Sequence, residues 1–155
     1  MTTEEKLALK RAVKEQCLAI MQERLRHVHD AIEETEDSVN NENKSTVGDK
    51  HEVARAMGHL QQEMMSGQLD KANDEIALIS ALNTDLLYDK VTTGAVVVCP
   101  DAIFFIAVGL GNILVNEQKV IVLSPIAPLA LSMLEKQRGD TFEFNRNMIA
   151  ITDIF

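Results

Sequence analysis

The sequence predicts an α+β protein in which two long helices precede a small β-rich domain. The first half of the chain contains no proline, and all three prolines fall in the second half. Proline interrupts helices, so this distribution favours long helices first and turns later. From Gly94 onward, β-branched and aromatic residues form short runs that are typical of strands. We therefore expect two domains, residues 1–85 and residues 86–155.

The first helix is predicted to begin near Thr3, whose hydroxyl can cap it, and to reach about Asp37. Apolar residues recur along it with alternating gaps of three and four, which indicates a heptad seam. Those residues are Leu18, Met21, Leu25, Val28 and Ile32.

A polar segment from Ser38 to Gly48, rich in Asn and Ser, predicts a loop. A second helix is expected to start between Thr46 and Asp49. Its predicted seam changes register after Met64, like a stutter. The seam residues are Val53, Met57, Leu60 and Met64, then Ala72, Ile76 and Ile79. Two helices of similar length joined by a short loop predict an antiparallel coiled-coil hairpin.

The second half predicts a small antiparallel sheet with one short helix at Pro128–Glu135. The expected strands are residues 95–99, 103–108, 113–115, 119–123, 141–144 and 148–151. The last two strands form a hairpin around Asn145-Arg146-Asn147.

Charge is distributed unevenly along the chain. The net charge is −9, and residues 1–85 hold 10 Lys and Arg against 17 Asp and Glu. Such acidity argues against a general nucleic-acid binder, and favours a partner that is cationic or that holds metal. No apolar run is long enough to span a bilayer, and the N-terminus lacks the apolar region of a secretory signal. We expect a cytoplasmic protein in which Cys17 and Cys99 are reduced.

An ordered series in the second half carries a family resemblance. It consists of Ser124-Pro125-Ile126-Ala127-Pro128-Leu129, then Leu134-Glu135-Lys136, then Gly139-Asp140-Thr141-Phe142. The series resembles the C-terminal domain of the GreA/GreB transcript-cleavage factors. That resemblance implies an FKBP-like domain preceded by a helical hairpin.

The tip of the predicted hairpin, residues 36–52, also resembles this family. Its Gly48-Asp49-Lys50-His51-Glu52 matches the family's G-D-x-x-E motif. The resemblance implies that the hairpin enters the secondary channel of RNA polymerase, where Asp49 and Glu52 act on the catalytic Mg²⁺ and stimulate cleavage of backtracked RNA. Carboxylates are hard oxygen ligands that suit Mg²⁺. Further tip candidates are Glu42, Lys44 and Lys50.

The resemblance also defines the expected partners. It implies that Ser124, Pro125, Ile126 and Pro128 dock on the polymerase, and that RNA and DNA are met only through the elongation complex. The chain would be a monomer that contacts no membrane and is no enzyme itself. It would bind no cofactor of its own, and Mg²⁺ would belong to the polymerase active centre.

Other interpretations remain open. The hairpin could occupy the polymerase channel as a modulator or inhibitor without stimulating cleavage. It could instead be a coiled-coil interaction module unrelated to polymerase, in which Asp49 and Glu52 simply form a capping-box-like helix start. A prolyl isomerase is a third alternative, suggested by the FKBP-like domain, and it requires an aromatic-lined pocket.

Overall fold

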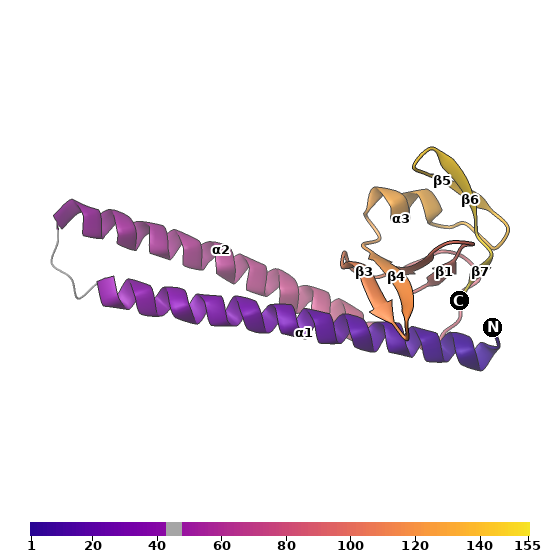
Figure 1. Cartoon of the computed structure of the whole chain (residues 1–155), viewed down its shortest axis with the longest axis horizontal. Coiled ribbons are helices and arrows are strands. Elements are labelled where there is room, and N and C mark those ends of the chain that lie inside the picture. The colour runs from indigo at the N-terminus through magenta and orange to yellow at the C-terminus, as the bar shows by residue number, and fades with distance from the viewer. Residues whose placement is uncertain (43–47) are drawn as a thin grey trace. The chain divides into compact units, whose positions relative to one another are not determined.

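The computed structural model describes the backbone of residues 1–42 and 48–155 and the side chains of residues 1–37 and 52–155 (Figure 1). Two long helices precede a small, mostly antiparallel sheet and a short helix, which confirms the α+β class. The helices are α1 (Thr3–Glu42), α2 (Gly48–Ala81) and α3 (Pro128–Met133). The strands are β1 (Val96–Val98), β2 (Ile103–Ile106), β3 (Gly111–Val115), β4 (Gln118–Leu123), β5 (Thr141–Phe144), β6 (Asn147–Ala150) and β7 (Asp153–Ile154). Among these helices, none has the length and apolar character that crossing a bilayer requires.

Contacts group the residues into two compact units. The first unit contains residues 1–19 and 78–155, and the second contains residues 20–77. Both long helices therefore contribute to both units. The domains predicted from the sequence pattern, 1–85 and 86–155, stay a prediction.

α1 begins at Thr3, as predicted, but its capping box is formed by Thr2 rather than Thr3. The backbone N–H of Glu5 donates to Thr2 Oγ1 at 3.2 Å, and the Thr2 backbone N donates to Glu5 Oε2 at 2.6 Å. The bond from the Thr2 backbone lowers the pKa of Glu5. At its other end α1 continues to Glu42, past the predicted end at Asp37. Polar residues lower helix propensity only slightly, so the change to Asn and Ser does not mark the helix end.

In residues 20–77 the two helices run antiparallel, side by side (Figure 1). On α1 the predicted seam faces inward: Met21 is buried, and Leu25, Val28 and Ile32 are half-buried. A contact between the helices joins Thr35 Oγ1 to Met65 Sδ at 3.7 Å.

On α2 the first part of the predicted seam is wrong. Its four residues, Val53, Met57, Leu60 and Met64, are 57% to 66% exposed. The buried and half-buried residues lie on a neighbouring face, namely Ala54, Gly58, Gln62, Met65, Leu69, Ala72, Ile76 and Ile79. Their gaps of three and four continue without a break, so the predicted stutter is absent. The hydrophobic pattern predicted the wrong face because the inward residues near the start of α2, Ala54 and Gly58, are small.

In the first unit the main sheet has the strand order β3-β4-β2-β1-β7. The prediction of an antiparallel sheet is wrong for one pair of strands, because β2 and β4 are parallel. Asn116 and Glu117, with φ of 48° and 66°, form a tight turn between β3 and β4. This hairpin places β4 next to β2 after two reversals of direction, which makes the pair parallel. Strands β5 and β6 form the predicted hairpin as a separate two-stranded sheet.

The core of the first unit lies between the main sheet, α3 and β5. Phe104 from β2 and Phe142 from β5 are buried and meet edge to face, with ring centroids 6.1 Å apart. The C-terminal Phe155 is also buried, and its backbone exchanges hydrogen bonds with Val96 at 2.7 and 3.0 Å. These hydrogen bonds continue the pairing of β7 with β1 and hold this two-residue strand, which the sequence did not predict.

Three cations near the start of α1 join it to the end of α2 and the following linker. Lys14 Nζ donates to the carbonyl oxygens of Ser80 and Leu82, each at 2.8 Å. Arg11 pairs with Asp85, and Lys10 donates to a linker carbonyl. Cations are favoured at a helix C-terminus, where carbonyl groups lack partners. Lys14 therefore satisfies carbonyl groups that the C-terminal end of α2 leaves without helical partners.

Candidate functional site at the hairpin tip

The predicted acidic motif occupies the beginning of α2. The helix starts at Gly48, inside the predicted interval, so Asp49 and Glu52 belong to its first turns. Residues three apart on a helix lie on the same side of it. The side chain of Glu52 is exposed, and that of Asp49 is outside the described residues. Negative charge is favoured at this end of a helix, where the helix dipole is positive, so the two carboxylates also suit the start of α2.

The secondary tip candidates lie around the same connection between helices. Glu42 is the last residue of α1, and Lys50 is the third residue of α2. The side chains of both are outside the described residues. Lys44 lies wholly outside them, within residues 43–47.

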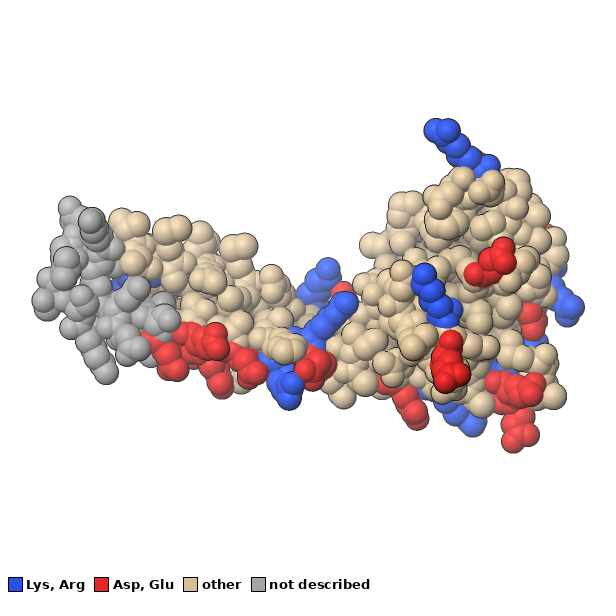
Figure 2. Space-filling view, in the orientation of Figure 1, with Lys and Arg blue, Asp and Glu red and all other residues tan. Residues whose placement is uncertain are grey.

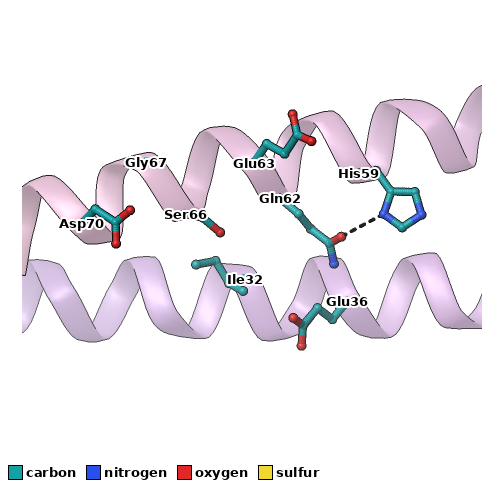
Figure 3. A pocket seen from close by; sticks show the side chains of 8 residues that line it. All are labelled: Ile32, Glu36, His59, Gln62, Glu63, Ser66, Gly67 and Asp70. Carbon is teal, nitrogen blue, oxygen red and sulfur yellow. Dashed lines mark hydrogen bonds between the residues drawn. The ribbon is translucent and has the colours of Figure 1, made fainter.

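A polar groove of about 700 Å³ lies between the helices of the second unit. Ile32 and Glu36 line it from α1 (Figure 3). From α2 it is lined by His59, Gln62, Glu63, Ser66, Gly67 and Asp70. His59 Nδ1 and Gln62 Oε1 lie 3.2 Å apart, within hydrogen-bond distance. The absence of a side chain at Gly67 opens this part of the helix surface.

The groove is acidic. Glu36, Glu63 and Asp70 are all exposed carboxylates on its walls. Residues 20–77 contain 6 Lys and Arg against 13 Asp and Glu, a net charge of −7 out of −9 for the chain. Figure 2 shows acidic side chains gathered along α1 next to the grey tip residues. The groove therefore suits cationic side chains of a partner. Sequence reasoning missed it because it depends on which faces of α1 and α2 meet.

A cluster of one histidine and two carboxylates lies on α1. The ligand atoms of His29, Asp30 and Glu33 lie within 4.8 Å of one another, and His29 Nδ1 is 3.6 Å from Glu33 Oε1. All three side chains are exposed. Neighbouring polar groups on an open helix surface are common without an ion, so we assign no metal to them.

The predicted polymerase-docking residues form the turn before α3. The Ser124 carbonyl accepts from Ala127 N at 3.0 Å, and Ser124 Oγ accepts from Ile126 N at 3.4 Å. Pro128 begins α3, where its missing N–H costs no helical hydrogen bond. Ser124 and Pro125 are half-buried, while Ile126 is 80% exposed. The turn therefore presents one large apolar side chain to solvent.

A second pocket bears on the prolyl isomerase alternative. It has a volume of about 310 Å³ and is lined by Cys99, Pro100, Asp101, Ala102, Met148, Ile149 and Ala150. That lining contains no aromatic side chain. Four of the five phenylalanines are instead buried, namely Phe104, Phe105, Phe142 and Phe155. The pocket thus lacks the lining that the alternative requires.

Comparison with known proteins assigns no family. No protein-family model matches the chain, and no curated protein matches it significantly.

Proposed function

We propose that the chain is an RNA polymerase-binding elongation factor of the GreA/GreB type. Its hairpin enters the polymerase secondary channel, and its tip carboxylates act on the catalytic Mg²⁺ to stimulate cleavage of backtracked RNA. The observation that supports this most strongly is the position of the G-D-x-x-E sequence. It begins α2 directly after the connection between two long antiparallel helices.

The tip carboxylates have the chemistry that this role needs. Mg²⁺ keeps several waters and is usually held by one or two carboxylates together with substrate phosphates. Asp49 and Glu52 would supply the carboxylates, and the polymerase and RNA the remaining ligands. A second metal ion stabilises the attacking and leaving oxygens of a phosphodiester cleavage. The chain on its own is not an enzyme in this proposal, because two carboxylates do not complete a metal site.

The β-rich part would anchor the hairpin on the polymerase. Its mostly antiparallel sheet with one short helix is compatible with the FKBP-like architecture that the resemblance implies. The exposed Ile126 in the turn between Ser124 and Pro128 gives the docking surface an apolar centre. The protein would act in the cytoplasm as a monomer.

The test is RNA 3′-end cleavage in a backtracked elongation complex built with purified polymerase from the same organism. Wild-type protein is expected to accelerate cleavage. Asp49→Asn/Glu52→Gln is expected to lose at least about tenfold of the stimulation, since each metal contact stabilises transition-state charge. It should still bind. The matched control is Glu33→Gln/Glu34→Gln, which removes two exposed carboxylates from α1 and should retain stimulation.

Two results would contradict the proposal in different ways. Failure of the wild-type protein to bind the polymerase would remove the partner altogether. Binding without accelerated cleavage, or with slower RNA synthesis, would identify the alternative, a channel modulator.

A second experiment tests the docking turn. Ile126→Asp is expected to weaken binding to the polymerase, because it places a charge in an apolar contact. Leu114→Asp is the control, as Leu114 is also exposed, at 63%, but lies on β3 outside the turn. Equal affinities for the two variants would argue against docking through this turn.

A further inference from the structure

A row of exposed apolar side chains follows one face of α2. We name it the α2 stripe, and it consists of Val53, Met57, Leu60 and Met64. The gaps of four, three and four place the four side chains on a single helix face. In Figure 2 the visible surface of α2 next to the grey tip consists mostly of uncharged residues. Ordered apolar surface of this kind commonly marks an interaction site.

The α2 stripe is not used in packing the hairpin. The face of α2 turned inward carries Ala54, Gly58, Met65 and Leu69, and Met65 contacts Thr35 of α1. Small residues at positions 54 and 58 allow the helices to approach each other without help from the stripe. The stripe is therefore an additional heptad face beside the one that holds the hairpin together.

The flank of the stripe is acidic. Glu63 and Asp70 on α2, with Glu36 on α1, line the groove described above. A partner that covers the stripe must therefore contact the four side chains with apolar groups. It must also place cationic side chains beside this acidic flank. Helices that dock by residues spaced at i, i+4, i+7 and i+11 do so in apolar grooves of a partner.

A second copy of the chain does not meet these requirements. The stripe covers 12 residues, about 18 Å of helix, which is less than two heptads. Stable coiled-coil pairing takes about three or more heptads. Two copies would also bring together hairpins that each carry a net charge of −7. Repulsion between like charges opposes that association.

We propose that the α2 stripe docks in an apolar groove rimmed by Lys and Arg on the protein partner of the hairpin. The inference rests on the proposed function in taking RNA polymerase as that partner. It adds a contact separate from the tip carboxylates: the tip acts on the metal ion, and the stripe supplies affinity along the hairpin.

Binding of the full chain to purified polymerase tests this contact. Met57→Gln/Leu60→Gln is expected to raise Kd about 10-fold to 100-fold, since each buried apolar side chain contributes roughly one decade of affinity. The control Leu114→Gln/Met148→Gln removes equally exposed apolar groups elsewhere and should change Kd less than about twofold. If the stripe variant binds as tightly as wild type, the inference is wrong while the proposed function stands. If wild type does not bind polymerase, both fail.

Two further measurements test whether the stripe is covered by α1 or by a second copy of the chain instead. Helix content and thermal unfolding of Met57→Gln/Leu60→Gln should match those of wild type, because both side chains are exposed. A loss of helix content would show that the stripe packs against α1 and would overturn the inference. Analytical ultracentrifugation should show wild-type monomers. A dimer that the same variant abolishes would show that a second copy covers the stripe.

Discussion

The Nζ of Lys10 lies 4.3 Å from the centroid of the Tyr88 ring, and the lysine side chain is only 1% exposed. The same Nζ donates to the carbonyl oxygen of Leu86 at 2.5 Å. A lysine from the start of α1 is thus enclosed by the linker that leads into the sheet. The ring and the carbonyl favour its charged form, while burial opposes it.

This burial predicts a pH dependence of stability. Burial lowers the pKa of Lys10 from 10.5 to about 8. Between those values the unfolded chain holds a proton that the folded chain has lost, so the free energy of unfolding rises with pH across this window. Relative to Lys10→Met, wild type should gain at most about 3 kcal/mol from pH 8 to 10.5. Urea unfolding of both proteins at several pH values measures the difference.

An exposed lysine controls for the simple loss of charge. Lys119→Met, on β4, should track wild type across the same pH range. If Lys10→Met and wild type also respond to pH in parallel, Lys10 does not titrate in the fold as described.

A pair of glycine substitutions should act in opposite directions. Gly94 has φ +92°, and an added Cβ would lie 3.2 Å from Tyr88 Oη and 3.4 Å from Leu82 Cδ2. Gly94→Ala is expected to destabilise the protein by about 1–3 kcal/mol. Gly67 is inside α2, and apart from its chain neighbours and the local helix backbone no atom lies within 4 Å of an added Cβ, so Gly67→Ala should increase helix stability by up to about 1 kcal/mol. Thermal unfolding followed by circular dichroism measures both, and equal effects would contradict the geometry.

The two cysteines should be chemically inert in the folded protein. Both are buried and free, and burial raises the pKa of Cys17 to about 12 and that of Cys99 to about 11. The thiolate is the reactive form, so a disulfide reagent should modify neither thiol until denaturant is added. Ser66→Cys provides a reactive reference, because Ser66 is exposed on α2. Rapid modification of both native cysteines would mean that they are accessible.

The stability of the protein at acidic pH depends on the ion pair between Lys6 and Asp153. Burial alone would raise the pKa of Asp153, but hydrogen bonds from Lys6 and from the Ile154 N–H hold it below its usual value. The native state therefore favours the carboxylate, and this stabilisation is lost as pH falls through the lowered pKa. Asp153→Asn should reduce the change in stability on acidification. An unchanged acid profile in urea unfolding would contradict this.

Much of the fold could be predicted from the sequence because its elements have strong local signals. The long helices lack proline, and most strands are runs of Val, Ile and Phe. The cap at Thr2 and strand β7 carry weak local signals, and β7 depends on backbone pairing with β1. The parallel pair β2 and β4 depends on the position of a hairpin, which periodicity along one strand does not encode.

The first part of the α2 seam was predicted wrongly for a different physical reason, whereas its later residues, Ala72, Ile76 and Ile79, are buried or half-buried as predicted. Two heptad patterns overlap on this helix, and the more apolar one, through Met57 and Leu60, faces solvent. The inward pattern contains Ala54 and Gly58, which allow close helix packing but add little hydrophobicity to the sequence pattern. The groove beside Glu63 likewise requires α1 and α2 together. The acidic motif at Asp49 and Glu52, by contrast, was predictable because it is contiguous in sequence.

Dependence of cleavage on Mg²⁺ tests the proposed role of the tip most directly. The cleavage rate of a backtracked elongation complex would be measured as a function of Mg²⁺ concentration, with wild type and with Asp49→Asn/Glu52→Gln. If the carboxylates help hold the catalytic ion, wild type should lower the Mg²⁺ concentration needed for half-maximal cleavage, and the variant should not. Identical Mg²⁺ dependence with wild type, with the bound variant and without any factor would contradict the proposal.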